Sequence, residues 1–178
     1  MDSIGLFRDL LVLSFHPTSL PRQDKFAPPA YRDLTADAIP AVAGDGFTVK
    51  VIAGEFDGVR GATGGDYVPA QLLDVELSPG SEFLLPTDPA ATVFLYVLLG
   101  EGECGAPAQH LPARRAVLFD TGSTVRVKAA AAGLRFVTFA ARPLGEPIAW
   151  GGPIVMNTDE ELRQASQELQ EGTFLRSH

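Results

Sequence analysis

Apolar and polar side chains alternate along the middle of the chain. Residues 47–52 (FTVKVI) and 73–77 (LDVEL) place an apolar side chain at every second position, which is the period of a strand with one buried face. Further short apolar segments follow without intervening helical patterns, at 82–86, 92–100, 114–120, 124–129 and 134–140. This spacing predicts an antiparallel sandwich or barrel.

Glycine and proline predict where these strands end. We expect a turn at Pro79-Gly80, a chain reversal at residues 100–102 (GEG) and an alanine-rich turn after residue 129. A glycine-rich stretch, residues 54–65, predicts a long loop. Prolines recur from residue 17 to residue 46, which favours an extended arm without regular structure.

A helical pattern follows the last apolar segment. Asn157 or Thr158 is expected to cap the helix, the acidic residues 159–161 (DEE) suit the positive end of its dipole, and Gly172 is expected to end it. The apolar positions that share one helical face are expected to pack on the barrel: Leu162, Ala165 and Leu169.

Composition narrows the class of protein and of partner. A chain of 178 residues with 46% hydrophobic residues is long enough for one domain with a buried core. Its formal net charge of -8 disfavours direct binding of nucleic acid. Arg114 and Arg115 are the nearest approach to a basic patch, and we interpret them as a solvated strand edge.

The cysteine content and the N-terminal segment bear on the compartment. Cys104 is the single cysteine, so the chain has no internal disulfide, which fits a reducing compartment. Nearby acids are expected to raise the pKa of its thiol and leave it an inert turn residue. The apolar run at 10–15 (LLVLSF) is too short to span a bilayer, and Asp2 and Asp9 stand where a secretory signal is basic. We expect an intracellular protein without a membrane partner.

The residues that carry chemistry form no recognisable site. The three histidines, His16, His110 and His178, show no ligand spacing, and we interpret His110 as a surface residue of a loop. Glu101 and Glu103 with Asp120 are conceivable as an acid–base group, but acids on a glycine-rich hairpin usually face solvent. We therefore predict no catalytic, cofactor-binding or metal-binding residue.

Several segments resemble known families. The stretch from Pro79-Gly80 to VLLGEG at 97–102 and the FDTG turn at 119–122 look like a cupin barrel. Residues 20–34 (LPRQDKFAPPAYRDL), 47–61 (FTVKVIAGEFDGVRG) and above all 142–174 (RPLGEPIAWGGPIVMNTDEELRQASQELQEGTF) resemble the pirin family.

This resemblance implies a mainly β fold: a single cupin-type barrel (double-stranded β-helix or jelly roll) with an N-terminal extended arm and a C-terminal helix. The expected division of the chain is a remnant or divergent segment at 1–16, a proline-rich arm or linker at 17–46, a barrel of the pirin C-terminal type at 47–145, and a family-specific tail with the helix at 146–178.

The resemblance also implies where a metal would be expected. Pirins are similar to one another in having tandem cupin barrels, with iron held by three histidines and a glutamate in the N-terminal barrel. We expect that barrel to be largely missing from this chain. In the remaining barrel the histidine-bearing positions correspond to Leu85, Thr87 and Val125 or their neighbours. We therefore expect no iron or other cofactor, and an interior filled by apolar side chains.

The first functional hypothesis is a non-enzymatic, metal-free module with an interaction or regulatory role. Its partner is expected to be a protein or a second copy, bound at the seam left by the missing barrel. Pirins are associated in eukaryotes with nuclear transcriptional co-regulation, so we expect a cytoplasmic location, or a nuclear one in a eukaryote. The possible contact surface comprises Ile148, Trp150, Pro153, Ile154 and Met156. The favoured interpretation of these residues is an interdomain surface or a core seam.

Two alternatives stay open from the sequence. One is a quercetin 2,3-dioxygenase-like enzyme, as the resemblance to full-length pirins implies, using His110, the acids of the GEGE turn at 100–103, or a partner subunit. The other is a shortened gene product without independent function.

Overall fold

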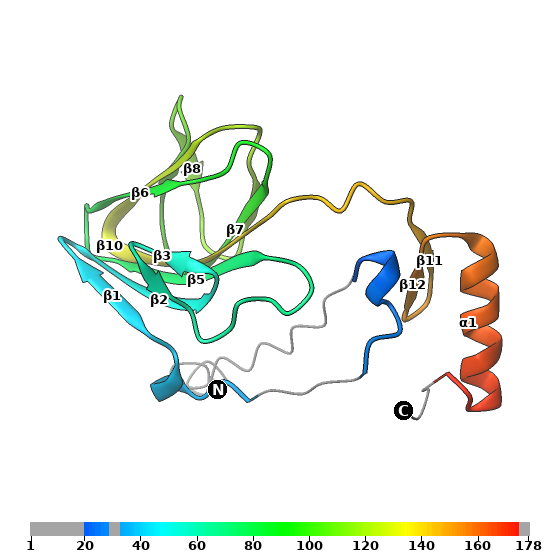
Figure 1. The fold of residues 1–178 in the computed structure, drawn as a ribbon. Helices are drawn as coiled ribbons and strands as arrows, with labels where there is room; N and C mark the ends of the chain where they lie inside the picture. Colours follow the sequence, from blue (N-terminus) through cyan, green and yellow to red (C-terminus); the bar gives the residue numbers. More distant parts are fainter. Residues whose placement is uncertain (1–19, 29–32, 175–178) are drawn as a thin grey trace, which may run out of the picture. The chain divides into compact units, whose positions relative to one another are not determined.

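The alternating segments form an eight-stranded antiparallel sheet (Figure 1). The structure is a computed structural model and describes residues 20–28 and 33–174. These residues belong to two compact units. The barrel unit is Leu34–Pro143, and the terminal unit combines described residues of Met1–Asp33 with those of Leu144–His178.

The barrel unit has the strand order β1-β2-β5-β10-β7-β8, with β6 beside β10 and β9 beside β7. Its two longest strands, β7 and β10, pair with each other along both of their halves. β10 also pairs with β6 near its start and with β5 near its end, so these two strands carry the sheet around the core. The bounds are β1 Ala41–Gly44, β2 Phe47–Ala53, β5 Ala70–Leu77, β6 Glu82–Pro86, β7 Thr92–Cys104, β8 Gln109–Leu111, β9 Ala116–Leu118 and β10 Thr124–Ala141.

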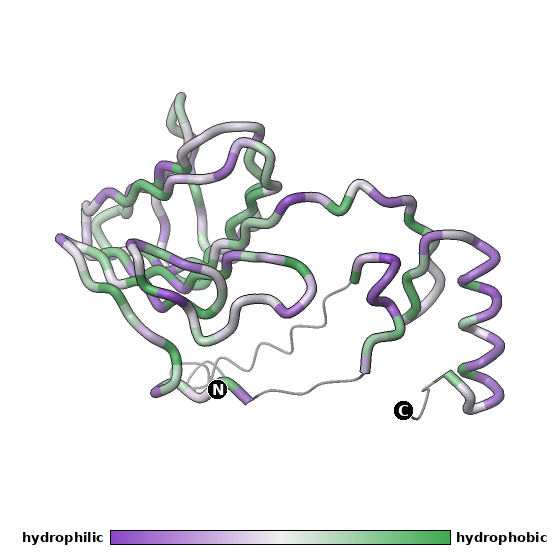
Figure 2. The backbone as a smooth tube through the Cα atoms, viewed as in Figure 1, coloured by the Kyte–Doolittle hydropathy of each residue, from purple (hydrophilic) through white to green (hydrophobic). Residues whose placement is uncertain are grey.

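The core lies inside this barrel. Buried and exposed residues alternate along most of β6 and β7 and along the first part of β10, and hydropathy alternates along the barrel strands in Figure 2. Phe83, Phe136 and Phe47 meet edge to face in the interior, with ring centroids 5.3 and 6.2 Å apart, a favourable aromatic geometry. The largest side chains with almost no exposure include Phe136, Leu73, Leu77, Leu85, Leu95 and Leu111. The mainly β, cupin-like fold expected from the sequence is thus confirmed.

Two expected turns are wrong. β7 continues through residues 100–102 to Cys104, and β10 continues through the alanine-rich stretch after residue 129. The extra residues of β10 are absorbed by an irregular pairing, because Ala129 lies opposite Gly102 whereas Leu134 lies opposite Gly100. Gly100 has a φ of 76°, and a Cβ there would come within 2.2 Å of the Gly133 carbonyl oxygen. The glycine allows the bulge and the close approach of the two backbones instead of ending the strand.

Three further segments differ from expectation. The proline-rich segment holds the strand β1 and two short 3-10 helices, η2 (Arg22–Asp24) and η3 (Ala36–Ala38). The glycine-rich loop contains a small hairpin of β3 (Glu55–Phe56) and β4 (Val59–Arg60). The segment at 114–120 keeps only the short strand β9. The strands among these segments, β1, β3, β4 and β9, are each paired with a neighbouring strand, and composition does not show such pairing.

The terminal unit packs one helix on one hairpin. β11 (Ala149–Gly151) pairs with β12 (Ile154–Met156), and α1 (Asp159–Glu171) follows. Thr158 caps α1, and Gly172 ends it with a φ of 72°, as the sequence predicted. Thr158 also forms a capping box with Glu161.

The apolar side of α1 packs on this hairpin. Leu162 and Ala165 join the cluster of Ile154 and Met156, whereas the sequence predicted a barrel surface for them. Leu169 is 51% exposed, so its expected core position is wrong. α1 carries hydrophilic residues over most of its length in Figure 2, and a narrow apolar side fits a hairpin of two three-residue strands. Among the described residues, no helix has the length and apolarity to cross a membrane.

The backbone contact at Gly100 gives a direct test of the irregular pairing. Gly58 has the same φ of 76°, but no atom lies within 4 Å of a Cβ placed there. Gly58→Ala should therefore cost only the backbone strain, about 1–2 kcal/mol. Gly100→Ala should lower the free energy of unfolding by about 1–3 kcal/mol more, because β7 and β10 must move apart. Chemical denaturation of both variants measures the difference, and equal losses would contradict the close approach.

Candidate functional site

The resemblance to cupins places the positions of potential metal ligands in the barrel interior. Leu85 on β6 and Val125 on β10 are register partners, and they are 1% and 5% exposed. Both point inward into the apolar cluster. Thr87 lies just beyond β6, and its hydroxyl donates a hydrogen bond to the Gly122 carbonyl at 3.2 Å. These three positions offer neither imidazole nor carboxylate, so the residues present do not fit an iron ion.

Buried polar side chains of the barrel unit are already paired. Asp74 is 4% exposed and accepts two hydrogen bonds from Arg135, at 2.9 and 2.6 Å. The hydrogen bond to Asp74 raises the pKa of the Arg135 guanidinium. Thr138 donates to the Phe94 carbonyl at 3.3 Å. Within residues 20–28 and 33–174, no three His, Cys, Asp or Glu side chains are placed to hold a metal ion.

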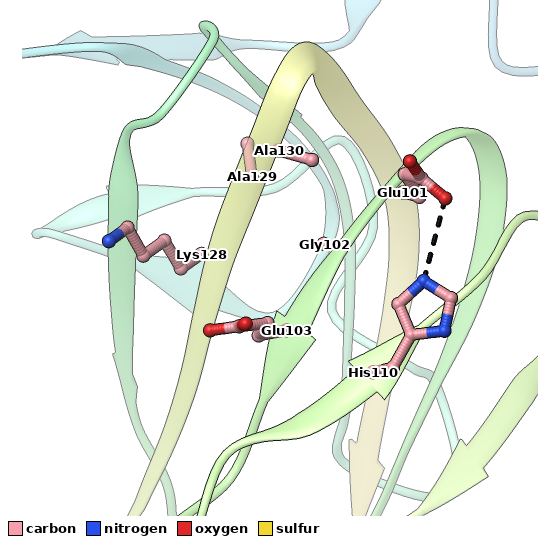
Figure 3. Close-up of a pocket in the computed structure, with 7 residues that line it drawn as sticks. All are labelled: Glu101, Gly102, Glu103, His110, Lys128, Ala129 and Ala130. Carbon is pink, nitrogen blue, oxygen red and sulfur yellow. Dashed lines mark ion pairs between the residues drawn. The ribbon is translucent and has the colours of Figure 1, made fainter.

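A hollow of about 280 Å³ lies on the outside of the barrel (Figure 3). His110 sits on β8, not in a loop as predicted, and opposite Glu103 of β7. Its Nε2 lies 3.4 Å from Glu101 Oε2, and the two side chains are 67% and 59% exposed. Figure 3 shows this pair on one side of Gly102, with Glu103 and Lys128 extending on the other side.

This hollow has the character of a solvated charged surface. Both carboxylates come from β7 and the imidazole from β8. Asp120, which the conceivable acid–base group included, is not among the lining residues. Exposed ion pairs of this kind contribute little, because water screens both charges. His16 and His178 fall outside the described residues.

Cys104 is buried at the end of β7, with 6% exposure. Burial raises the pKa of its thiol, so the protonated, unreactive form is favoured. The expected direction of the pKa shift agrees with the structure, but its cause is desolvation, whereas the sequence suggested nearby acids. The residue is also part of a strand and not of a turn.

In the terminal unit, side chains from the two ends of the chain meet. Arg22 donates to Glu161 Oε1 from Nε at 3.0 Å and from Nη2 at 2.6 Å. The Arg22 backbone N–H donates to Glu146 Oε2 at 2.9 Å, and the Asn157 amide donates to the same oxygen at 2.9 Å. The hydrogen bond from Arg22 holds the pKa of the Glu161 carboxyl below its usual range.

Sequence reasoning missed this cluster, although it had singled out Asn157 and Glu161 as helix-start residues. The partners lie 124 and 139 residues apart along the chain, and no local pattern connects them. The one available signal was that the segments containing both partners, residues 20–34 and 142–174, resemble the pirin family. This resemblance predicts that both segments are present in one protein, but it does not predict their contact.

The predicted interaction surface divides into two groups. Ile148 and Trp150 are each 74% exposed, and Pro153 is exposed as well. Ile154 and Met156 are 9% and 4% exposed because they point toward α1, so they belong to the core and not to a surface. Successive residues of a strand point to opposite faces, which separates the two groups. Trp150 shares one face of the hairpin with its register partner Val155, whereas Ile154 and Met156 lie on the other face. We name Ile148, Trp150 and Pro153 the hairpin surface.

Comparison with known proteins decides the family. The model of the pirin C-terminal cupin domain matches residues 72–175. The chain belongs to the pirin family. A pirin-like protein of Caulobacter vibrioides is 39% identical over 88% of this chain and 56% of its own length, and human pirin is 34% identical over 83% and 51%. A crystal structure of quercetin 2,3-dioxygenase from Acinetobacter baumannii superposes with a TM-score of 0.79, at 30% identity over 88% of this chain and 54% of that one.

The matched region extends beyond the barrel. It includes β11, β12 and α1, so the terminal hairpin and helix are part of the pirin domain. The chain spans about half the length of the curated relatives it matches. What the whole pirins do therefore bears on this chain only as a proposal.

The Arg22–Glu161 pair predicts a pH-dependent stability of the terminal unit. A carboxyl whose pKa is lower in the folded state stabilises that state above its unfolded pKa, and the contribution is lost as the pH falls through the folded pKa. Glu161→Gln keeps an oxygen for the capping box but removes the charge. We expect it to lower the melting temperature at pH 7, with a difference from the unmodified chain that shrinks below about pH 4.3.

Fluorescence of Trp150, the single tryptophan of the chain, reports on this unit during melting. Glu160→Gln is the matched control, because its side chain is 88% exposed and 3.7 Å from Arg163. Glu160→Gln should change the melting temperature much less than Glu161→Gln does at pH 7, and it should also change it little below about pH 4.3. A Glu161→Gln difference that stays constant down to low pH would contradict the ion pair.

Proposed function

We propose that this pirin-family chain is a non-enzymatic, metal-free cupin module that acts by binding another protein. The observation that carries the proposal is the closed, apolar interior of its barrel. Dioxygen chemistry needs a redox metal with open coordination positions. Leu85 and Val125 fill the corresponding interior positions with packed hydrocarbon, so the fold here serves as a scaffold.

The hairpin surface supports the interaction role. Trp150 and Ile148 are largely exposed, and the indole N–H of Trp150 donates to the Gly152 carbonyl at 2.8 Å, which restrains the ring. A restrained, exposed tryptophan is the kind of side chain that contributes most at protein interfaces. The net charge of -8 favours a protein partner over nucleic acid.

The second candidate is a quercetin 2,3-dioxygenase-like activity. Its support is the similarity to the Acinetobacter baumannii quercetin 2,3-dioxygenase, at 30% identity. The residues of this chain that would have to serve it are Glu101, Glu103 and His110, around the hollow in Figure 3. They supply one imidazole in a solvated setting, which is a poor ligand set for iron. The apolar interior therefore weighs in favour of the first candidate.

Metal binding separates the two candidates. Purified without chelator, the full chain should carry no stoichiometric iron by elemental analysis and should not consume quercetin when iron(II) is added. Adding iron(II) should also leave the melting temperature of the chain unchanged. If the chain did bind iron(II), a concentration a hundredfold above the dissociation constant would stabilise the folded state by about 2.7 kcal/mol.

His110→Ala is the matched variant for this experiment. If the unmodified chain bound about one iron per chain and the variant lost it, the hollow would be a metal site. Iron-dependent turnover of quercetin by the unmodified chain would overturn the non-enzymatic proposal outright.

A further inference from the structure

We propose that residues 10–15 of this chain (LLVLSF) dock on its own hairpin surface, beside Trp150, and compete there with any protein partner. Docking of this kind regulates the hairpin surface, so the inference rests on the proposed interaction role. It follows from the uncovered side of the terminal hairpin and from the point at which the N-terminal part of the chain reaches the terminal unit.

The hairpin of β11 and β12 has one covered side and one open side. Ile154 and Met156 point toward α1 and are 9% and 4% exposed. Trp150 and its register partner Val155 share the opposite side. Ile148 stands two residues before Trp150, and each of the two is 74% exposed. Neighbouring exposed apolar side chains gain free energy when another apolar segment covers them.

The N-terminal part of the chain arrives beside this open side. The Arg22 backbone N–H donates to Glu146 Oε2 at 2.9 Å, and Glu146 stands two residues before Ile148. The rings of Phe26 and Phe174 have centroids 6.1 Å apart. The segment from Arg22 to Phe26 therefore runs between Glu146 and the residue that follows the end of α1. The chain that precedes Arg22 continues from the Glu146 end, which is the end closer in sequence to Ile148.

The sequence before Arg22 supplies an apolar segment within reach. Residues 1–19 lie outside the described residues, and five of the six residues at 10–15 are Leu, Val or Phe. The seven residue steps from Phe15 to Arg22 span up to about 24 Å when extended, whereas the four steps from Glu146 to Trp150 span at most about 14 Å. The apolar run can therefore contact the hairpin surface of its own chain.

The short connection favours this occupant over a second copy or a separate protein. A segment tethered by a few residues has an effective concentration on the order of 1 mM at its site. Two copies with a formal net charge of -8 each also repel one another. The run at 10–15 carries no charged side chain, so docking desolvates no charge on it. A partner of the hairpin surface must displace the run, which lowers the apparent affinity of that partner.

Quenching of Trp150 fluorescence by acrylamide measures the docking directly, because Trp150 is the single tryptophan. The charged variant Leu11→Asp should release the run from the apolar surface. Acrylamide should quench the unmodified full chain about threefold less than Leu11→Asp, because docking should reduce the exposed fraction of the indole to about one quarter. Equal quenching in the two proteins would overturn the inference.

Ser3→Asp is the matched control for Leu11→Asp. It places the same carboxylate in the same N-terminal stretch but outside residues 10–15, and its quenching should equal that of the unmodified chain. Quenching raised equally by Ser3→Asp and Leu11→Asp would show a general effect of charge and contradict docking by the apolar run.

Ile148→Asp tests the other side of the same contact. Ile148 is 74% exposed, so the variant should fold, and its melting temperature checks this. It should raise the quenching of Trp150 as much as Leu11→Asp does. The double variant should raise it no further, because both substitutions break one contact. Additive increases would show that the two residues act separately and would overturn the inference.

The dependence on protein concentration distinguishes the chain's own segment from a second copy. Quenching of the unmodified chain should be the same at about 1 µM and about 100 µM, because a tethered segment binds at a fixed effective concentration. Quenching that increases on dilution would assign the cover to a second copy and overturn the intramolecular docking.

Failure of this inference and failure of the proposed function give different results. Stoichiometric iron with quercetin turnover would remove the non-enzymatic role, while the weak quenching of Trp150 in the unmodified chain would remain. Strong quenching in the unmodified chain would remove the docking and leave the hairpin surface open for a protein partner.

Discussion

The pairing of β7 with β10 is the constraint on which the barrel depends. These strands pair with each other along both halves and also supply the neighbours of β5, β6, β8 and β9. Their backbones approach so closely that a Cβ at Gly100 or Gly102 would lie 2.2 Å from a carbonyl oxygen of β10. Because both positions lack a side chain, the two strands can curve around one apolar interior instead of diverging.

This curvature determines where chemistry can occur. The inward positions that the strands bring together carry Leu, Val and Phe side chains, and the barrel closes over them. Polar groups that are buried in the barrel unit, such as Asp74 and Thr138, are paired within it. On the outward positions of the same strands, the alternation leaves Phe94, Tyr96 and Leu118 exposed.

Sequence reasoning recovered what depends on local patterns. The period of two located the main strands, and the residues at 157–172 located α1 and its caps, because both signals come from neighbouring residues. It misjudged the glycines at 100–102 as a chain reversal, since their role depends on the backbone of β10. It could not separate Ile154 and Met156 from the exposed residues of the same segment, because the hairpin that turns them toward α1 is not visible in composition.

The contacts of Arg22 show the remaining limit. Its bonds to Glu146 and Glu161 join the two ends of the chain, and nothing in the local sequence of either end requires the other. Membership of the pirin family predicts that both segments are present but not which atoms meet.

The same distinction applies to function. Family membership gives the barrel, while chemistry depends on the side chains at particular positions. In this chain the resemblance points toward a dioxygenase, whereas Leu85 and Val125 fill the interior. A metal ion is held by donor atoms and not by a fold, so the side chains at these positions bear more directly on chemistry than the fold does.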